Sequence, residues 1–421
     1  MTDSSPRAFS GITILDLTRV WAGPLATRML GDLGANVIKI EATWARGPKA
    51  VPASDVRVSG RYPNNEAGDR PWNREGMFNK LNRSKRSLTL QLDTREGRDI
   101  FERLVPLADV VIENYTPRVM PQLGLGYERL RELNPGIVYV SMPGYGWSGP
   151  SRDFAALGTT LEPEAGLSSL MGYEDSGPYK SGVAWADPVA AMHGAAAVLM
   201  GILDRDAHPE RRGQAIELAQ VEGMICFIGA EILAVQQPRN ISRPRGNRHP
   251  YQAPQGCYPC AGDDRWIAII VTSDAEWTAL CEVAGFGKEL VSLTPDERMA
   301  RHAEMDVAIG RWTRLCDRDE LESLLQRHGI AACSVNDARD IVEHPHLQSR
   351  RFFAEIEHPD AGRHLFPGLP IKLSGTPASY ERPAPGLGEH NEEILRGMLG
   401  LSTTEIEELR LAGIISEEPP G

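Results

Sequence analysis

Short apolar runs alternate with amphipathic stretches over the first third of the chain. Segments with the length and composition of buried strands lie at residues 11–17, 36–40, 87–92, 109–114 and 137–141. Segments with helical periodicity separate several of them, at residues 25–33, 95–108 and 127–133. A strand, a helix and another strand in succession form a parallel unit with a right-handed crossover. The pattern therefore predicts an α/β fold whose large domain has a parallel, Rossmann-like, doubly wound sheet.

The pattern changes in the second half of the chain. Helices are expected from residue 187 to about 204 and from about 216 to 236. Residues 238–254 are rich in Arg, Asn and Pro, which is typical of a loop. A strand at 266–271, followed by several amphipathic helices, predicts a small α+β domain. Residues 341–385 are punctuated by proline and are expected to be extended.

A length of 421 residues exceeds one ordinary core and predicts about two domains. We assign residues 1–204 to the large domain, with two C-terminal helices within 386–421 completing it. Residues 205–244 are expected to form a linker helix and loop. The small domain is assigned to 245–335, and an extended return linker to 336–385.

Composition excludes several classes of protein. The net charge of −12 argues against a general nucleic-acid-binding protein, which is normally basic. The apolar stretch near Gly194–Leu203 is short of a bilayer span, so no membrane association is expected. The six cysteines are scattered, which fits a reducing cytoplasm. Cys257 and Cys260 form a C-x-x-C pair, but no second pair has the spacing of a zinc site, so packed thiols and no metal are expected.

A single carboxylate at the start of a small-residue helix is the main candidate for chemistry. Asp187 precedes Pro188, and Asp suits the N-cap as Pro suits the first helical position, so a structural cap explains the local sequence. The positive end of the helix dipole would also keep the carboxylate ionised. An ionised carboxylate can attack an activated carbonyl and form a covalent intermediate. Locally the cap is favoured, and only the rest of the chain favours a nucleophile.

The end of the second strand carries one feature of dinucleotide-binding proteins. Glu41 lies where an acid that binds a ribose would stand. The first turn, residues 19–24, lacks the glycine fingerprint, however, and Trp21 and Pro24 would block the close approach of a pyrophosphate. Binding of NAD or FAD is therefore not expected.

Several short blocks follow one another in a fixed order along nearly the whole chain. They lie at residues 15–24, 30–41, 82–87, 109–117 and 133–135, around Asp187, and at 212–214 and 387–391. In their order and combination the blocks resemble the family III CoA-transferases, also called the CaiB/BaiF family, which includes formyl-CoA transferase and α-methylacyl-CoA racemase. The resemblance implies a large Rossmann-like domain, a small domain, and two ring-shaped chains that interlock as a homodimer.

The resemblance also implies roles for individual residues. Asp187 falls on the position of the catalytic aspartate, which would carry an aspartyl-CoA intermediate without a metal. The contacts to coenzyme A are implied at Val20, Ala22, Arg46, Lys85, Arg86 and Arg118, and the substrate pocket at Trp21 and Tyr145. From the residues alone, Lys85 and Arg86 could equally belong to a solvated turn before a strand, and Tyr145 could simply pack a loop.

Some positions depart from individual branches of the family. Leu157 stands where the racemases have a histidine, and His193 lies inside a helix, so racemisation is not expected. Residues 246–250 replace the glycine-rich loop of formyl-CoA transferase, and Trp21 replaces a glutamine. We therefore expect oxalate to be a poor acceptor and the acyl group to be larger or less polar. Glu162 and Glu164 are expected to be solvated loop charges rather than partners of Arg248.

The sequence thus predicts a CoA-transferase that moves CoA from an acyl-CoA thioester to a carboxylic acid through Asp187. Two alternatives remain open: an acyl-CoA racemase or isomerase in which Asp187 is an acid/base, and a CoA-binding subunit that needs a partner chain.

Overall fold

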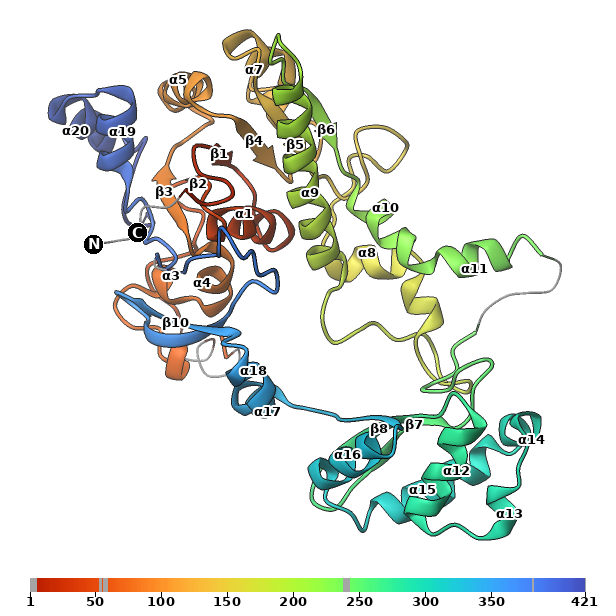
Figure 1. Ribbon diagram of the computed structural model, residues 1–421. Coiled ribbons are helices and arrows are strands. Elements are labelled where there is room, and N and C mark those ends of the chain that lie inside the picture. The colour runs from red at the N-terminus through yellow and green to blue at the C-terminus, as the bar shows by residue number, and fades with distance from the viewer. Residues whose placement is uncertain (1–5, 53–54, 56–59, 238–242, 381, 421) are drawn as a thin grey trace. The chain divides into compact units, whose positions relative to one another are not determined.

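The computed structural model describes residues 6–52, 55, 60–237, 243–380 and 382–420 (Figure 1). The chain forms two compact units. The larger one contains residues 1–168, 180–239 and 350–421, and the smaller one contains residues 169–179 and 240–349. The segment 169–179, which sequence analysis placed in the large domain, therefore belongs to the smaller unit.

The larger unit is built on a six-stranded sheet in which every pairing is parallel. Its strands are β1 (Thr13–Asp16), β2 (Asn36–Glu41), β3 (Lys85–Thr89), β4 (Val110–Glu113), β5 (Val138–Ser141) and β6 (Ala215–Glu217). Their order, β3-β2-β1-β4-β5-β6, is that of doubly wound sheets. In such sheets the ligand site lies beyond the carboxyl ends of the strands, where the strand order reverses, which is here between β1 and β4.

Helices cover both faces of this sheet. Ile14, Val37 and Val110 point to the face covered by α1 (Ala22–Asp32) and α9 (Ala186–Ala207). Leu15 and Ile38, one residue further along each strand, point to the opposite face, as the two-residue period of a strand requires. That face is covered by α5 (Arg95–Leu104), α7 (Tyr127–Leu133) and the C-terminal helices α19 (Asn391–Leu399) and α20 (Thr403–Leu411). Figure 1 shows α19 and α20, in blue, beside α5.

Shorter elements complete the larger unit. They are η1 (Pro63–Asn65), α3 (Pro71–Arg74), α4 (Gly76–Asn82), η2 (Val105–Leu107), α6 (Val119–Gln122), α8 (Gly158–Glu164), η3 (Leu167–Leu170), which reaches into the segment 169–179, α10 (Gln220–Ile225), η4 (Cys226–Ile228), α11 (Gly229–Ala234), β10 (Phe353–His358) and β11 (Gly362–Pro367).

The smaller unit packs helices against a three-stranded antiparallel sheet. The strands are β7 (Gln255–Pro259), β8 (Trp266–Ile270) and β9 (Ala331–Ser334), in the order β7-β8-β9. The helices are α12 (Asp274–Ala284), α13 (Lys288–Val291), α14 (Pro295–Ala300), α15 (His302–Thr313), α16 (Arg318–Arg327), α17 (Ala338–Glu343) and α18 (Pro345–Ser349).

Two predicted segments were wrong in part. The helix expected from about residue 216 begins only at Gln220, because Ala215–Glu217 pair with Tyr139–Ser141 as the edge strand β6. The segment 341–385 is not extended throughout. It starts within α17, continues through α18, and then forms the hairpin β10–β11, whose second strand begins at Gly362 with φ +83°. The first difference arises from pairing with residues distant in the sequence, which local periodicity does not report.

Helix α9 is longer than the sequence suggested. Its 22 residues are long and apolar enough to cross a membrane by length and composition, so the expectation of a stretch far short of a bilayer span was wrong. Buried residues make up 56% of that apolar window, as in the core helix of a soluble protein. Small residues allow α9 to pack closely against its neighbours, since a Cβ at Gly194 would lie 2.7 Å from the sulfur of Met142.

Candidate active site

The turn between β1 and α1, which we call the β1–α1 turn (residues 17–24), meets the start of α9. Val20 in this turn has a φ of +66°, a left-handed conformation that is unfavourable for a β-branched residue. Trp21 precedes the first residue of α1, and Ala22 begins the helix. The backbone N–H of Ala22 has no acceptor within its own helix. It faces the carboxylate of Asp187 and lowers the pKa of that group.

Asp187 lies inside the first turn of α9 and does not cap it. The helix begins at Ala186, and Trp185 occupies the position before it without a side-chain capping bond. The interpretation of Asp187 as an N-cap was therefore wrong, because its carboxylate reaches α1 instead of the amides of its own helix. The first turns of two helices meet at this carboxylate, and the positive ends of both helix dipoles favour its charged form.

Burial works against that charge. Only 7% of Asp187 is exposed, and this burial raises the pKa of its carboxyl group, while the bond from Ala22 N–H lowers it. The carboxylate also lies directly against α8, where a Cβ built on Gly158 would be 1.8 Å from Oδ2. Only glycine leaves room for the carboxylate at that position. A poorly solvated carboxylate held by one backbone donor is suited to nucleophilic attack.

Glu162 holds the segment that leads to Asp187. Its Oε1 accepts a bond of 2.8 Å from the N–H of Ser181, and its Oε2 accepts one of 2.8 Å from the Ser181 hydroxyl. Glu162 is buried, with 1% of its surface exposed, so the expectation of a solvated loop charge was wrong for this residue. Glu164 is exposed, as expected. Arg248 belongs to the smaller unit and pairs there with Asp306, at 3.0 Å.

A cavity of about 620 Å³ opens beyond the carboxyl ends of β1 to β4, on the side of the β1–α1 turn that carries Val20. Aromatic and cationic side chains form part of its walls, among them Arg19, Trp44, Arg46, Phe78 and Tyr115. The Arg19 guanidinium lies over the Trp44 ring at 5.3 Å, and the Arg46 guanidinium over the Phe78 ring at 3.8 Å. Aromatic faces beside arginines can bind a base and its phosphates.

The residues that the resemblance assigned to CoA occupy different environments. Val20 and Arg46 line the cavity, and Ala22 contacts Asp187. Arg46 is itself buried, with both nitrogens of its fork on the carboxylate of Glu41 (3.0 and 2.6 Å). Arg118 is exposed at the start of α6, directly before Val119 of the cavity wall.

Lys85 and Arg86 lie elsewhere. Lys85 is the first residue of β3 and is fully buried against Asp16, so the alternative of a solvated turn was wrong for it. Arg86 points to the amino ends of the strands, where its guanidinium bonds to Glu393 (2.8 Å) and Asn36 (2.6 Å). It lines a separate cavity there, of about 740 Å³.

The two residues assigned to the substrate pocket lie beside the helices that meet at Asp187, Trp21 just before α1 and Tyr145 in the apolar cluster between α8 and α9. Trp21 follows Val20 in the β1–α1 turn, and Lys80 Nζ lies 5.1 Å from the centre of its indole ring. Its Nε1 is covered and has no acceptor among the residues that the structure describes. Tyr145 meets Phe154 edge to face at 6.0 Å and packs with Leu161 and Val189, which support α8 and α9.

Two sequence features have structural explanations. The block at residues 387–391 bonds along the outer strand β3: the N–H of Gly388 donates to Ser87 Oγ, and the N–H of Thr89 donates to Asn391 Oδ1, each at 2.9 Å. Cys257 and Cys260 are free thiols on and just after β7, and burial raises the pKa of each. Among the described residues, no group of three or more His, Cys, Asp or Glu side chains could hold a metal ion.

Sequence reasoning missed Gly158 and gave no role to Asn114. Gly158 follows Leu157 and could have been noticed only from its spacing to Asp187. Asn114 was quoted within the block 109–117, and the contacts that show its role join residues 95 positions apart.

Comparison with known proteins identifies the family of this chain. Residues 9–391 match the model of CoA-transferase family III, and the protein belongs to this family, as the sequence predicted. It is 31% identical over 417 residues to the succinyl-CoA–D-citramalate CoA-transferase of Chloroflexus aurantiacus (97% of this chain, 98% of the relative). It is 33% identical over 418 residues to the succinate–glutarate CoA-transferase of Agrobacterium fabrum (94% and 97%).

A solved structure agrees with this membership. A CaiB/BaiF family protein from Brucella suis superposes with a TM-score of 0.80 at 27% identity, covering 93% of this chain and 100% of that one. The shared fold is a mixed α/β fold with a central parallel sheet.

Proposed function

We propose that this protein is an acyl-CoA:carboxylate CoA-transferase in which Asp187 carries CoA as an aspartyl thioester. One observation carries the proposal: the buried Asp187 carboxylate meets Ala22 N–H in the same turn whose Val20 lines the cavity beyond the sheet. A thioester bound to this turn would have its nucleotide in the cavity and its carbonyl near Asp187. The family and the printed names of the relatives support the reaction class.

The first half of the reaction loads CoA onto the enzyme. An Asp187 oxygen attacks the thioester carbonyl of the donor, the C–S bond of the tetrahedral adduct breaks, and CoA leaves as a thiolate, which gives a mixed anhydride. The thiolate then attacks the aspartyl carbonyl of the anhydride. The donor acid leaves as its carboxylate, taking the bridging oxygen, and an aspartyl-CoA thioester remains.

The second half reverses these steps on the acceptor. An acceptor carboxylate oxygen attacks the aspartyl-CoA carbonyl and displaces the thiolate, which gives a second anhydride. The thiolate attacks the acceptor carbonyl of that anhydride, the acceptor leaves as its CoA thioester, and the Asp187 carboxylate is restored. Ala22 N–H is a backbone donor that could stabilise the oxyanions formed on the aspartyl carbon.

The fate of oxygen tests this route. One oxygen of each acceptor carboxylate passes into Asp187 and, in the next turnover, into the released donor acid. With acceptor labelled in heavy oxygen, mass spectrometry should find label in the peptide that contains Asp187, and hydroxylamine should trap a hydroxamate there. A racemase or a non-catalytic CoA-binding subunit predicts neither result, so unlabelled Asp187 in a protein that turns over would overturn the proposal.

We further propose Val20, Ala22, Arg46 and Arg118 as contacts of the CoA nucleotide, together with Arg19 and Trp44 from the same cavity. Val20 is 69% exposed at its rim. Lys85 and Arg86, unlike Arg46, do not line this cavity and are engaged by Asp16 and Glu393, which supports roles other than direct contact. Trp21 and Tyr145 remain our candidates for the acyl pocket, with an acyl group larger or less polar than oxalate.

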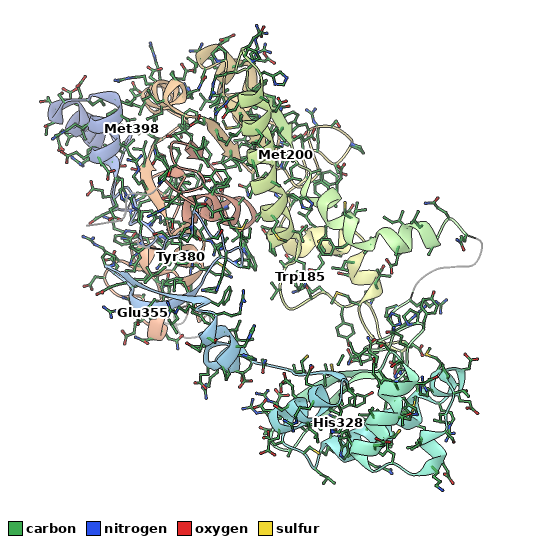
Figure 2. The ribbon with its side chains drawn as sticks, viewed as in Figure 1. Trp185, Met200, His328, Glu355, Tyr380 and Met398 are labelled. Carbon is green, nitrogen blue, oxygen red and sulfur yellow. The ribbon has the colours of Figure 1, made fainter. Side chains whose placement is uncertain are left out.

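The proposed enzyme is a cytoplasmic homodimer. All six cysteines are free thiols, which supports a reducing compartment. The outer face of α9 exposes Met192, Leu199, Met200 and Leu203, which fall on one side of the helix and are 42–60% exposed. Figure 2 labels Met200 on this face and Trp185 just before the helix. An apolar stripe of this kind supports an interface with a second copy, and light scattering of Met200→Glu against wild type tests it.

A further inference from the structure

Side chains from four neighbouring strands hold the backbone of the β1–α1 turn. They are Asp16 of β1, Lys39 of β2, Lys85 of β3 and Asn114, which directly follows β4, and we call them the strand-end cluster. Asp16, Lys39 and Lys85 are buried, with at most 4% exposed.

The first part of the turn is held at both backbone atoms of Thr18. The N–H of Thr18 donates to Asp16 Oδ1 at 2.9 Å, and Lys39 Nζ donates to the carbonyl of Thr18 at 2.8 Å. Burial raises the pKa of Asp16, but the charges of Lys85 and Lys39 and the hydrogen bonds outweigh it and lower the pKa to about 2. Asp16 is therefore charged under all working conditions.

Asn114 holds the next residue in the same two-sided way. The N–H of Arg19 donates to Asn114 Oδ1 at 2.8 Å, and Asn114 Nδ2 donates to the carbonyl of Arg19 at 2.9 Å. The side-chain amide of Asn114 thus makes the two hydrogen bonds that a neighbouring strand would make to the backbone of Arg19.

Lys85 joins the two ends of the turn. Its Nζ donates to Asp16 Oδ2 (2.9 Å), to the carbonyl of Pro24 (3.0 Å) and to Asn82 Oδ1 (2.9 Å). These bonds use all three protons of the ammonium group, so none is left for a phosphate. All the hydrogen bonds of this lysine, which belongs to the block at residues 82–87, are thus made to the protein itself.

The held residues enclose the strained part of the turn. Val20, at φ +66°, follows Arg19, and the close approach of Gly23 to Thr18, where a Cβ would lie 2.2 Å from Thr18 Cβ, makes the turn compact. Strain of this kind persists where the surroundings determine the conformation. Ala22, whose N–H reaches Asp187, lies between the two held ends.

We propose that Lys85 and Asn114 are positioning residues, which act through the β1–α1 turn to aim Ala22 N–H at the Asp187 carboxylate. The proposal rests on the function proposed above, with Asp187 as the nucleophile. It assigns the lysine of the family block to the alignment of the nucleophile, whereas the sequence had assigned it to the nucleotide.

The pH dependence gives a readout that overall stability does not affect. Burial raises the pKa of Asp187, and the N–H of Ala22 lowers it. The titratable groups on the helices packed around it include Glu162 on α8, His193 on α9 and Arg28 on α1, and each has a partner of its own: Ser181, the Val189 carbonyl and Asp32. If Ala22 N–H moves away, burial is unopposed and the pKa of Asp187 rises further.

The test uses the full-length enzyme with Lys85→Met, Lys85→Arg and Asn114→Ala, and Lys49→Ala as a control that removes an exposed lysine outside the site. For Lys85→Met and Asn114→Ala we expect kcat to fall about 10- to 100-fold, with KM for the acyl-CoA nearly unchanged. The acidic limb of the pH profile of kcat/KM should move to higher pH. Lys85→Arg should recover part of kcat, and Lys49→Ala should match wild type.

Two results would overturn the proposal. A rise in KM with unchanged kcat would return Lys85 to the nucleotide, and a folded Asn114→Ala enzyme with an unshifted acidic limb would show that the turn needs no such support. If Lys85→Met does not fold, Asn114→Ala decides alone. Neither result bears on the nucleophile itself, because loss of label transfer in Asp187→Asn tests that separately.

Discussion

The backbone N–H of Ala22 faces the carboxylate of Asp187 and lowers its pKa, although 165 positions separate the two residues. The contact brings the first turns of α1 and α9 together at one buried carboxylate. It also joins the proposed nucleophile to the turn that borders the cavity at the carboxyl edge of the sheet. The proposed chemistry depends on this contact, and the expected behaviour of several variants follows from it.

Asp187→Asn should abolish CoA transfer to below about 1% of the wild-type rate and leave the protein folded. The substitution removes the nucleophile but no capping bond, since Asp187 caps nothing, and the amide is nearly isosteric. Transfer assays with thermal unfolding on the same sample check this. Turnover above that level would mean that another group forms the covalent intermediate.

Gly158→Ala should lower kcat by about 100-fold. A Cβ at this position would lie 1.8 Å from Asp187 Oδ2, so the carboxylate must leave its place. Gly182→Ala is the matched control, because a Cβ there meets nothing within 4 Å and the residue lies in the segment just before Asp187. Equal activity of the two variants would remove Gly158 from the site.

Arg19→Ala should raise KM for CoA thioesters about tenfold with little change in kcat, because uniform binding of a remote group appears in KM. Arg19 lines the cavity and lies over Trp44. The salt dependence of KM should also weaken. Arg95→Ala, which removes an exposed arginine paired with Asp99 on α5, serves as control. A change confined to kcat would place Arg19 at the chemistry.

Trp21→Gln should shift the substrate preference towards small dicarboxylic acids by about 1–3 kcal/mol in relative kcat/KM. Trp21, with its large indole, directly precedes Ala22. A smaller polar side chain would leave room for the second carboxylate of a dicarboxylic substrate. A panel of CoA thioesters and acids, including oxalate and succinate, measures the ranking. An unchanged ranking with a lower melting temperature would show that Trp21 only packs the turn.

Asp16 should make stability fall at acid pH. Its folded pKa of about 2 lies below the value of 3.8 expected in the unfolded chain, so its contribution is complete above pH 4 and is lost as the pH falls towards 2. The contribution is about 2 kcal/mol. Urea unfolding between these pH values should show the loss in wild type and a smaller loss in the double variant Asp16→Asn/Lys85→Met, which removes both buried charges together.

Local patterns predicted much of the larger unit. The apolar runs placed β2, β4 and β5 within a residue or two, and Tyr127–Leu133 matches α7. Such elements depend on side chains a few positions apart, which periodicity reports directly. Strand β6 was missed because three residues at a sheet edge carry too little pattern, and the hairpin β10–β11 because prolines flank it.

The sequence by itself determined the family, the parallel α/β architecture and the candidacy of Asp187, since these depend on the order of short blocks and on local periodicity. Only the tertiary structure decided what surrounds that carboxylate. Ala22, Gly158 and Asp187 come from three separate segments, and Lys85 meets Asp16 across 69 positions. A lysine in a polar block looks solvated in the sequence. It is buried here because the fold packs it against Asp16, Pro24 and Asn82, and burial requires that its charge be paired.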